Sequence, residues 1–130
     1  MKDPARHSHG TILCAGTAAA FAAVTPAALL MSAASGNLWL FLSAYLFGVP
    51  LALVHSWALG LPAYFVLREH WDLTWTRAAL GGLVVGALPA TILFLAVGGR
   101  ATGALGMAGS TGLLGAAGGL GFRAYLLFLE

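Results

Sequence analysis

The sequence contains few charged residues. Of its 130 residues, 8% are charged, with 6 Lys and Arg and 4 Asp and Glu, whereas a soluble domain has about 25% charged residues. Hydrophobic residues make up 60% of the chain, and the mean hydropathy is +0.91. This balance excludes a disordered chain and argues against a soluble enzyme, because long apolar runs require a lipid environment.

Residue sets that carry chemistry are also scarce. Cys14 is the single cysteine, so no intramolecular disulfide can form and a secreted disulfide scaffold is excluded. The sequence lacks a Ser-His-Asp set, paired carboxylates, a phosphate-binding loop and a dinucleotide fingerprint. His7 and His9 are typical of a solvated tail, and no Lys/Arg cluster suits nucleic acid. We therefore expect no enzymatic activity, no cofactor, no metal site and no nucleic-acid partner.

The apolar residues fall into four uncharged runs. These runs cover about residues 11–35, 38–67, 78–97 and 103–122. Since about 20 apolar residues cross the hydrocarbon core of a bilayer, the pattern predicts an all-α polytopic membrane protein, a bundle of four transmembrane helices with short loops. We expect one domain over 11–130 after a tail over 1–10. A secretory signal is the alternative for the first run, but signal cores have only about 7 to 15 apolar residues, so a retained helix is favoured.

The segment 68–77 separates the second and third runs and differs from both. It holds four of the ten charges and two Trp residues. Trp side chains concentrate at the boundary between lipid and water, so Trp71 and Trp75 are predicted to anchor a loop at that boundary. Thr74 or Thr76 is the expected N-cap of the next helix.

Glycine and proline mark the other expected turns and bends. Gly36-Asn37 is a turn signal, and residues 98–102 form a second one. Pro50 and Pro62 lie inside the second run and predict tilt or a kink there. Arg123 interrupts the last apolar stretch, and we expect the helix to continue past it while its guanidinium reaches the headgroups.

The charges are distributed unequally between the two sides of a four-span bundle. One side receives both termini and five cations: Lys2, Arg6, Arg68, Arg77 and Arg123. The opposite side receives only Arg100. Cytoplasmic loops of membrane proteins are enriched in Lys and Arg. The count therefore predicts a multi-pass protein, with the lipid bilayer as its surroundings and both termini in the cytoplasm.

The fourth run has a glycine at every third position. The series comprises Gly103, Gly106, Gly109, Gly112, Gly115, Gly118 and Gly121. Collagen is excluded because the intervening positions contain no proline. In hydrocarbon each unpaired backbone group costs several kcal/mol, which favours a helix despite the glycines. Three residues advance about 300°, so the series winds around the helix and predicts close neighbours on several sides, either within the bundle or from another subunit.

Glycines four residues apart occur in both of the last two runs. Gly82 and Gly86 form one such pair and Gly115 and Gly119 another, with Gly112 one turn before them. Small residues at this spacing let helix backbones approach closely. Ordinary helix packing is the simpler interpretation, and a specific dimerisation face is the alternative.

Four polar residues within the apolar runs form a candidate intramembrane polar site. His55 lies near the middle of the second run and Ser56 follows it, while Thr17 and Thr25 belong to a polar stripe of the first run. An ionisable residue inside a membrane is a functional candidate, for proton transfer or ligand contact. The alternative is a neutral His hydrogen-bonded between helices, for instance to a carbonyl freed by Pro62. This alternative is favoured, because no acidic residue or second His lies at that depth.

In size and span count the chain is similar to the small multidrug resistance transporters and the small fluoride channels. It lacks the carboxylate that the first family has in its first span and the Asn and aromatic pattern of the second. Three segments of the second and third runs share a Gly followed closely by a Pro, and the first two also contain Tyr: Tyr45-Leu46-Phe47-Gly48-Val49-Pro50, Gly60-Leu61-Pro62-Ala63-Tyr64 and Gly86-Ala87-Leu88-Pro89. The pattern looks like a group of uncharacterised bacterial four-span membrane proteins. This resemblance implies a four-span protein of the bacterial inner membrane and no particular activity.

Two functions follow from these patterns. The first is a non-catalytic accessory subunit that acts through helix packing, as a homo-oligomer or in a larger membrane complex. The alternative is a small transporter or channel whose path is lined by His55 and the hydroxyls of the first span.

Overall fold

The regular structure of the chain is helical. The computed structural model describes residues 8–67 and 72–129, and no strand occurs in these two ranges. The elements are α1 (His9–Ser35), α2 (Leu38–His55), the π-helical turn η2 (Ser56–Gly60), α3 (Leu61–Leu67), α4 (Trp75–Ala96) and α5 (Ala101–Phe128). The predicted all-α class is confirmed.

Three helices are long and apolar enough to cross a membrane. They are His9–Ser35, the continuous rod Leu38–Val66 and Trp75–Ala96. α5 is not among them although it has 28 residues, because its glycines and Arg123 lower its hydropathy. The structure thus supports a membrane protein by helix length and composition.

Short polar side chains begin three of the helices. The Ser8 hydroxyl accepts the Thr11 N–H at 3.2 Å, and the Asn37 side chain accepts the Trp39 N–H at 2.9 Å. Thr74, one of two predicted caps, accepts the Arg77 N–H at 3.3 Å. Each cap satisfies an N–H that has no partner inside its own helix.

The predicted helix boundaries shift by a few residues in the structure. α1 begins at His9, two residues before the predicted start, because Ser8 supplies the cap. α4 begins at Trp75, so this residue lies in the helix rather than in the predicted loop, and Trp71 lies outside the described residues. α5 continues past Arg123 to Phe128, as expected for the end of the chain.

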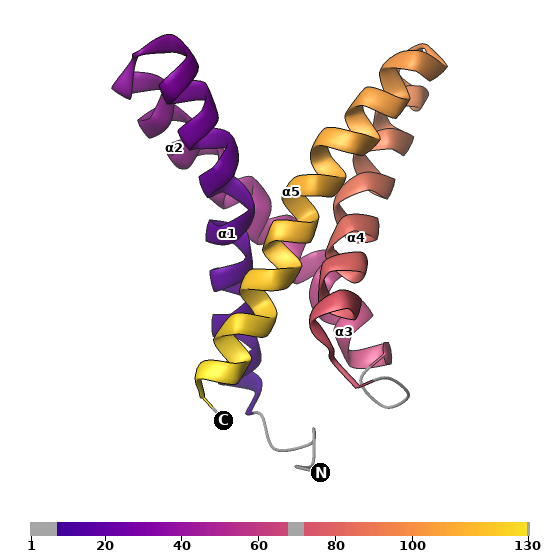
Figure 1. Ribbon diagram of the computed structural model, residues 1–130. Coiled ribbons are helices and arrows are strands. Elements are labelled where there is room, and N and C mark those ends of the chain that lie inside the picture. Colours follow the sequence, from indigo (N-terminus) through magenta and orange to yellow (C-terminus); the bar gives the residue numbers. More distant parts are fainter. Residues whose placement is uncertain (1–7, 68–71, 130) are drawn as a thin grey trace.

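The helices form a V with two arms (Figure 1). α1 packs against α2 in one arm and α4 packs against α5 in the other, and the arms are joined where α1 and α5 cross. The rod from α2 through α3 passes behind this crossing. The start of α1, the last residues of α5 and the start of α4 lie at the closed end of the V.

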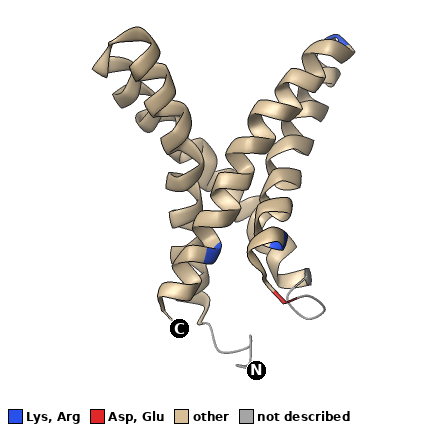
Figure 2. Ribbon diagram, viewed as in Figure 1, with Lys and Arg blue, Asp and Glu red and all other residues tan. Residues whose placement is uncertain are grey.

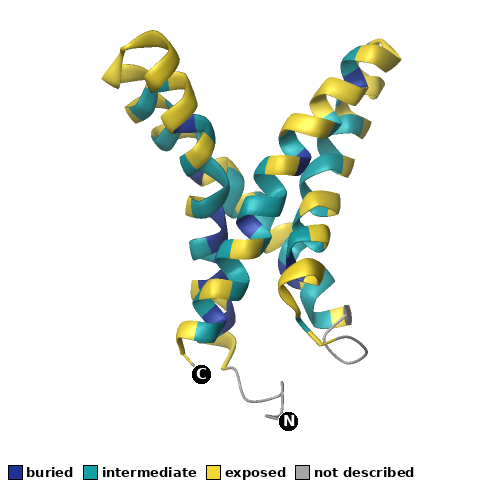
Figure 3. Cartoon of the chain, in the orientation of Figure 1, coloured by how far each residue is buried: buried dark blue, intermediate teal, exposed yellow. Residues whose placement is uncertain are grey.

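Few side chains are buried, and they are small. Figure 3 shows buried positions mainly where α1 packs against α5, and Ile12 and Leu126 are the largest side chains that are fully buried. Most large apolar side chains of α2 and α4 are exposed, with Leu46 at 69% and Leu93 at 67%. Such a surface suits lipid, where helices associate through close packing rather than through burial from water.

Candidate functional site

The rod that runs from α2 to α3 contains a π-helical turn at the crossing. Over Ser56–Gly60 the helix widens, and the Leu61 N–H donates to the Ser56 carbonyl five residues earlier. Pro62 lies two residues after the end of this turn, and a proline ring in a regular α-helix clashes with the carbonyl four residues before it. The wider turn leaves room for the proline ring and changes the direction of the neighbouring side chains relative to a regular α-helix. Single π turns of this kind occur frequently at functional sites.

His55 is the last residue before the π turn and points toward α4. Its Nε2 lies 2.8 Å from the Val85 carbonyl oxygen, in a half-buried position. Since a carbonyl only accepts, Nε2 carries the proton and donates it. Val85 stands midway along α4, about 15 Å from either end of that helix. The bond therefore joins two helices near the middle of the predicted membrane.

The partner of His55 is a carbonyl that its own helix leaves without the usual donor. In an α-helix the Val85 carbonyl accepts from residue 89, but residue 89 is proline and has no N–H. The sequence interpretation assigned this role to Pro62. The structure shows a His55 bond between helices, as the favoured interpretation requires, but the freed carbonyl belongs to α4 rather than to the helix of His55.

Ser56 and Trp57 contact α1 on the other side of the π turn. The Ser56 hydroxyl donates to the Gly16 carbonyl at 3.1 Å. A Cβ at Gly16 would lie 3.2 Å from the Trp57 indole, so the absence of a side chain lets α1 come this close. The π turn is thus tied to α1 through Ser56, while His55 reaches α4.

The two candidate threonines of the first span bond elsewhere. The Thr17 hydroxyl donates to the Leu13 carbonyl at 3.0 Å, and the Thr25 hydroxyl donates to the Phe21 carbonyl at 2.7 Å. Thr25 also contacts the Tyr45 hydroxyl of α2. The two bonds to Leu13 and Phe21 join each threonine to a carbonyl four residues earlier in the same helix, a common arrangement for hydroxyls in apolar helices. The structure therefore places His55 and Ser56 together and gives Thr17 and Thr25 separate partners.

The predicted packing glycines meet at the contact between α4 and α5. A Cβ at Gly82 would overlap the Gly115 carbonyl oxygen, and a Cβ at Gly115 would overlap that of Gly82. A Cβ at Gly86 would lie 3.0 Å from the Gly115 Cα. Gly119 is equally close to the backbone of α4, so hydrogen alone fits at these positions. Gly112 is less tight, with a Cβ 3.3 Å from the Ala87 side chain.

Of the remaining glycines of α5, Gly103 lies against the Phe94 ring of α4, and the others divide between a contact with α1 and open space. A Cβ at Gly118 would lie 3.0 Å from the Ala19 carbonyl oxygen of α1, and one at Gly121 would overlap the Ala22 side chain. Gly106 and Gly109 have no neighbour within 4 Å in the described part of the chain. The glycine series therefore lets α4 pack closely on one side of α5 and α1 on another.

Aromatic rings surround the closed end of the V. Tyr64 of α3 packs edge-on against Phe122 of α5, with 5.1 Å between the ring centres, and Phe65 lies 6.2 Å from His9 of α1. Arg77 lies near the start of α4 and Arg123 near the end of α5, toward this end, whereas Arg100 precedes α5 at the open tip of the same arm. Figure 2 shows blue residues at both ends of this arm. Aromatic rings and cations together are typical of the level of the lipid headgroups.

Sequence reasoning identified His55 and Ser56 but missed three of the residues that complete this site. Val85, Gly16 and Trp57 carry no ionisable group, and two of them act through backbone carbonyls. The one available signal was Pro89, which releases the carbonyl of the residue four positions earlier.

The side chains at the crossing join helices through backbone carbonyls. Within residues 8–67 and 72–129, no three His, Cys, Asp or Glu side chains gather to hold a metal ion. His55 offers one imidazole, and its Nε2 is engaged by the Val85 carbonyl.

Comparison with protein-family models, with curated proteins and with solved structures gave no match to this chain.

Proposed function

We propose that the chain spans the bacterial inner membrane four times, with α5 as the fourth span and both termini in the cytoplasm. At 1.5 Å per residue, the 28 residues of α5 reach about 42 Å, against a hydrocarbon core of about 30 Å. α5 packs along the whole of α4 as a close antiparallel partner (Figure 1). The resemblance of the second and third spans to bacterial four-span proteins agrees with this count.

The orientation is testable with single cysteines at the two ends of α4. In a Cys14→Ala background, we expect Arg100→Cys to react with a membrane-impermeant maleimide in intact spheroplasts. Asp72→Cys should react only after permeabilisation, because the positive-inside rule places its end in the cytoplasm. The measurement is the labelled fraction of each variant before and after permeabilisation. Labelling of Asp72→Cys in intact spheroplasts contradicts the proposed topology.

We infer that this protein is a non-catalytic subunit that acts through helix contacts, in a homo-oligomer or a larger membrane complex. The observation that carries this function is the bonding at the crossing. His55 donates to a backbone carbonyl, Ser56 donates to another, and Thr17 and Thr25 bond within α1 or to α2. These candidate side chains therefore already have hydrogen-bond partners, and the partners of His55, Ser56 and Thr25 include groups on other helices, which supports a packing role over the transporter alternative.

The open form of the V agrees with a subunit that takes part in an assembly. Exposed apolar side chains cover both arms, including Leu42 and Phe47 on α2 and Leu88 and Ile92 on α4. In a bilayer such faces contact either lipid or other helices. A chain of 130 residues with arms that diverge leaves much helix surface for such contacts.

Association is tested with two differently tagged copies expressed together. We expect the copies to purify together in a mild detergent, or a defined membrane complex to be crosslinked to the chain in cells, because helix contacts are the proposed activity. Step counting of a fluorescent fusion in native lipid particles gives the number of copies. A chain that is monomeric in lipid and crosslinks to no other protein contradicts the proposal.

A further inference from the structure

Two interrupted helices face each other at the vertex of the V. The rod from α2 to α3 changes to a π turn over Ser56–Gly60, and α4 loses one backbone bond at Pro89. Helices bend at such points, because a π turn or a proline weakens the ladder of backbone bonds. Each arm therefore contains one helix that is weakened near the vertex.

A single side chain joins these two weak points. His55 precedes the π turn directly, and its Nε2 donates to Val85, the carbonyl that Pro89 frees. The α2–α3 rod comes closest to α4 at the π turn. The arms are also connected at the α1–α5 crossing, where Gly118 and Gly121 lie against α1, and by the Tyr64 ring of the rod, which packs against Phe122 of α5.

We propose that His55 is a positioning residue that sets the angle between the two arms, by fastening the π turn of one arm to the proline-weakened point of the other. Without the Nε2–H donor, the Val85 carbonyl has no side chain to hold it to the π turn. The two helices are then free to bend independently. The α1–α5 crossing keeps the arms joined and is the point about which they would then move.

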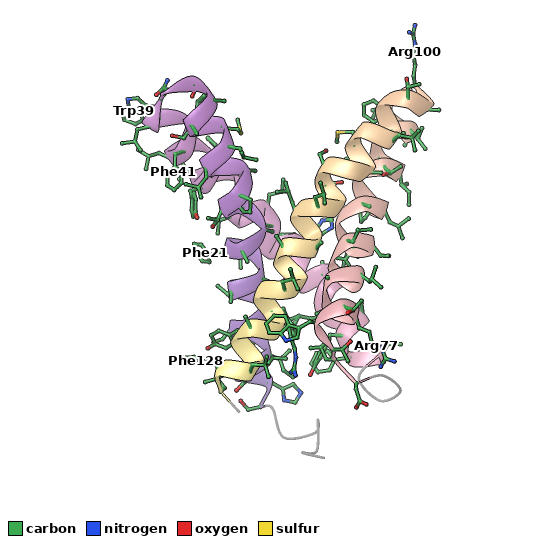
Figure 4. The ribbon with its side chains drawn as sticks, viewed as in Figure 1. Phe21, Trp39, Phe41, Arg77, Arg100 and Phe128 are labelled. Carbon is green, nitrogen blue, oxygen red and sulfur yellow. The ribbon has the colours of Figure 1, made fainter. Side chains whose placement is uncertain are left out.

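The arms have ends that are well placed for a distance measurement. Leu38 begins α2 at the tip of one arm and is 67% exposed, and Arg100 precedes α5 at the tip of the other (Figure 4). From His55 to Leu38 the arm measures about 25 Å. A bend of about 20°, the size of an ordinary helix kink, therefore displaces its tip by roughly 9 Å.

The experiment measures the distance between the two tips by double electron–electron resonance. Spin labels are attached to Leu38→Cys and Arg100→Cys in full-length Cys14→Ala protein in nanodiscs. With His55 present we expect one narrow distance distribution. His55→Leu should shift or broaden it by roughly 9 Å, and His55→Gln, which retains an N–H donor, should restore part of the original distribution.

Ser56→Ala is the matched control. It removes a neighbouring hydrogen bond of the same kind, but that bond ties the π turn to α1, within the same arm. We expect its distance distribution to equal that of the parent. An unchanged distribution in His55→Leu, or an equal change in Ser56→Ala, overturns the proposal.

Pro89→Ala keeps the proposal testable where His55→Leu does not fold. Alanine restores an N–H at position 89, so α4 regains a backbone bond to Val85 and loses its weak point. We expect a distribution that is narrower than that of the parent, with the same mean or a smaller one. A broader distribution in Pro89→Ala contradicts a weak point at this position.

Discussion

Replacing Gly115 by Leu is expected to separate α4 from α5 and to lower the free energy of unfolding by about 3 kcal/mol or more, the upper part of the range for overpacked sites. A Cβ at this position would overlap the Gly82 carbonyl oxygen and would lie 2.9 Å from the Gly86 Cα. Both neighbours are backbone atoms, which cannot rotate aside as a side chain can. The free energy is measured by reversible unfolding in mixed detergent micelles.

Gly109→Leu is the matched control on the same helix. Nothing described lies within 4 Å of a Cβ at this position, so the larger side chain meets no obstacle within the chain. Leucine also favours a helix over glycine by roughly 1 kcal/mol, and we expect a stability equal to the parent or slightly higher. Equal losses in Gly109→Leu and Gly115→Leu contradict a specific α4–α5 contact.

The glycine series shows how far the sequence determines packing. A period of three on a helix that turns 100° per residue implies that several sides of the helix lack side chains. This rotation predicts that neighbours can approach α5 from more than one direction. It does not assign Gly115 to α4 and Gly118 to α1, because that choice depends on how the other helices cross α5.

The helix ends were more accessible to sequence reasoning than the bends. Thr74 was one of two predicted caps, and the turn at Gly36 follows from the ability of glycine to adopt the positive φ of 63° found there. Local chemistry decides these features. The π turn is different, because Pro62 predicts a bend but not how the backbone absorbs it.

His55 marks the limit of sequence reasoning in this chain. Its position inside an apolar run predicted a polar contact, and its bond to a backbone carbonyl agrees with the favoured interpretation. The identity of the partner depends on the arrangement of two separate spans. Pro62 was the nearer proline in sequence, but Pro89 releases the carbonyl that His55 reaches, 30 residues away along the chain.

A double-mutant cycle of His55 and Pro89 is expected to show a coupling of about 1 kcal/mol or more between two residues that share one carbonyl. His55→Leu alone should lower the free energy of unfolding by about 2 kcal/mol, because it leaves the Val85 carbonyl unpaired in an apolar environment. In the Pro89→Ala background the new N–H at position 89 bonds that carbonyl. The same His55→Leu change should then cost about 1 kcal/mol or less.

Pro50→Ala separates this coupling from a general effect of proline. Pro50 lies in the same rod as His55, but the carbonyl it frees is that of Leu46, four residues before it, which is not the partner of His55. His55→Leu and Pro50→Ala should therefore add to within about 0.5 kcal/mol. Additivity of His55→Leu with Pro89→Ala as well would show that His55 stabilises the protein without the Val85 carbonyl. Coupling with Pro89 alone places the stabilising bond at the junction of α2 and α4, since only there does a proline release the carbonyl that the imidazole reaches.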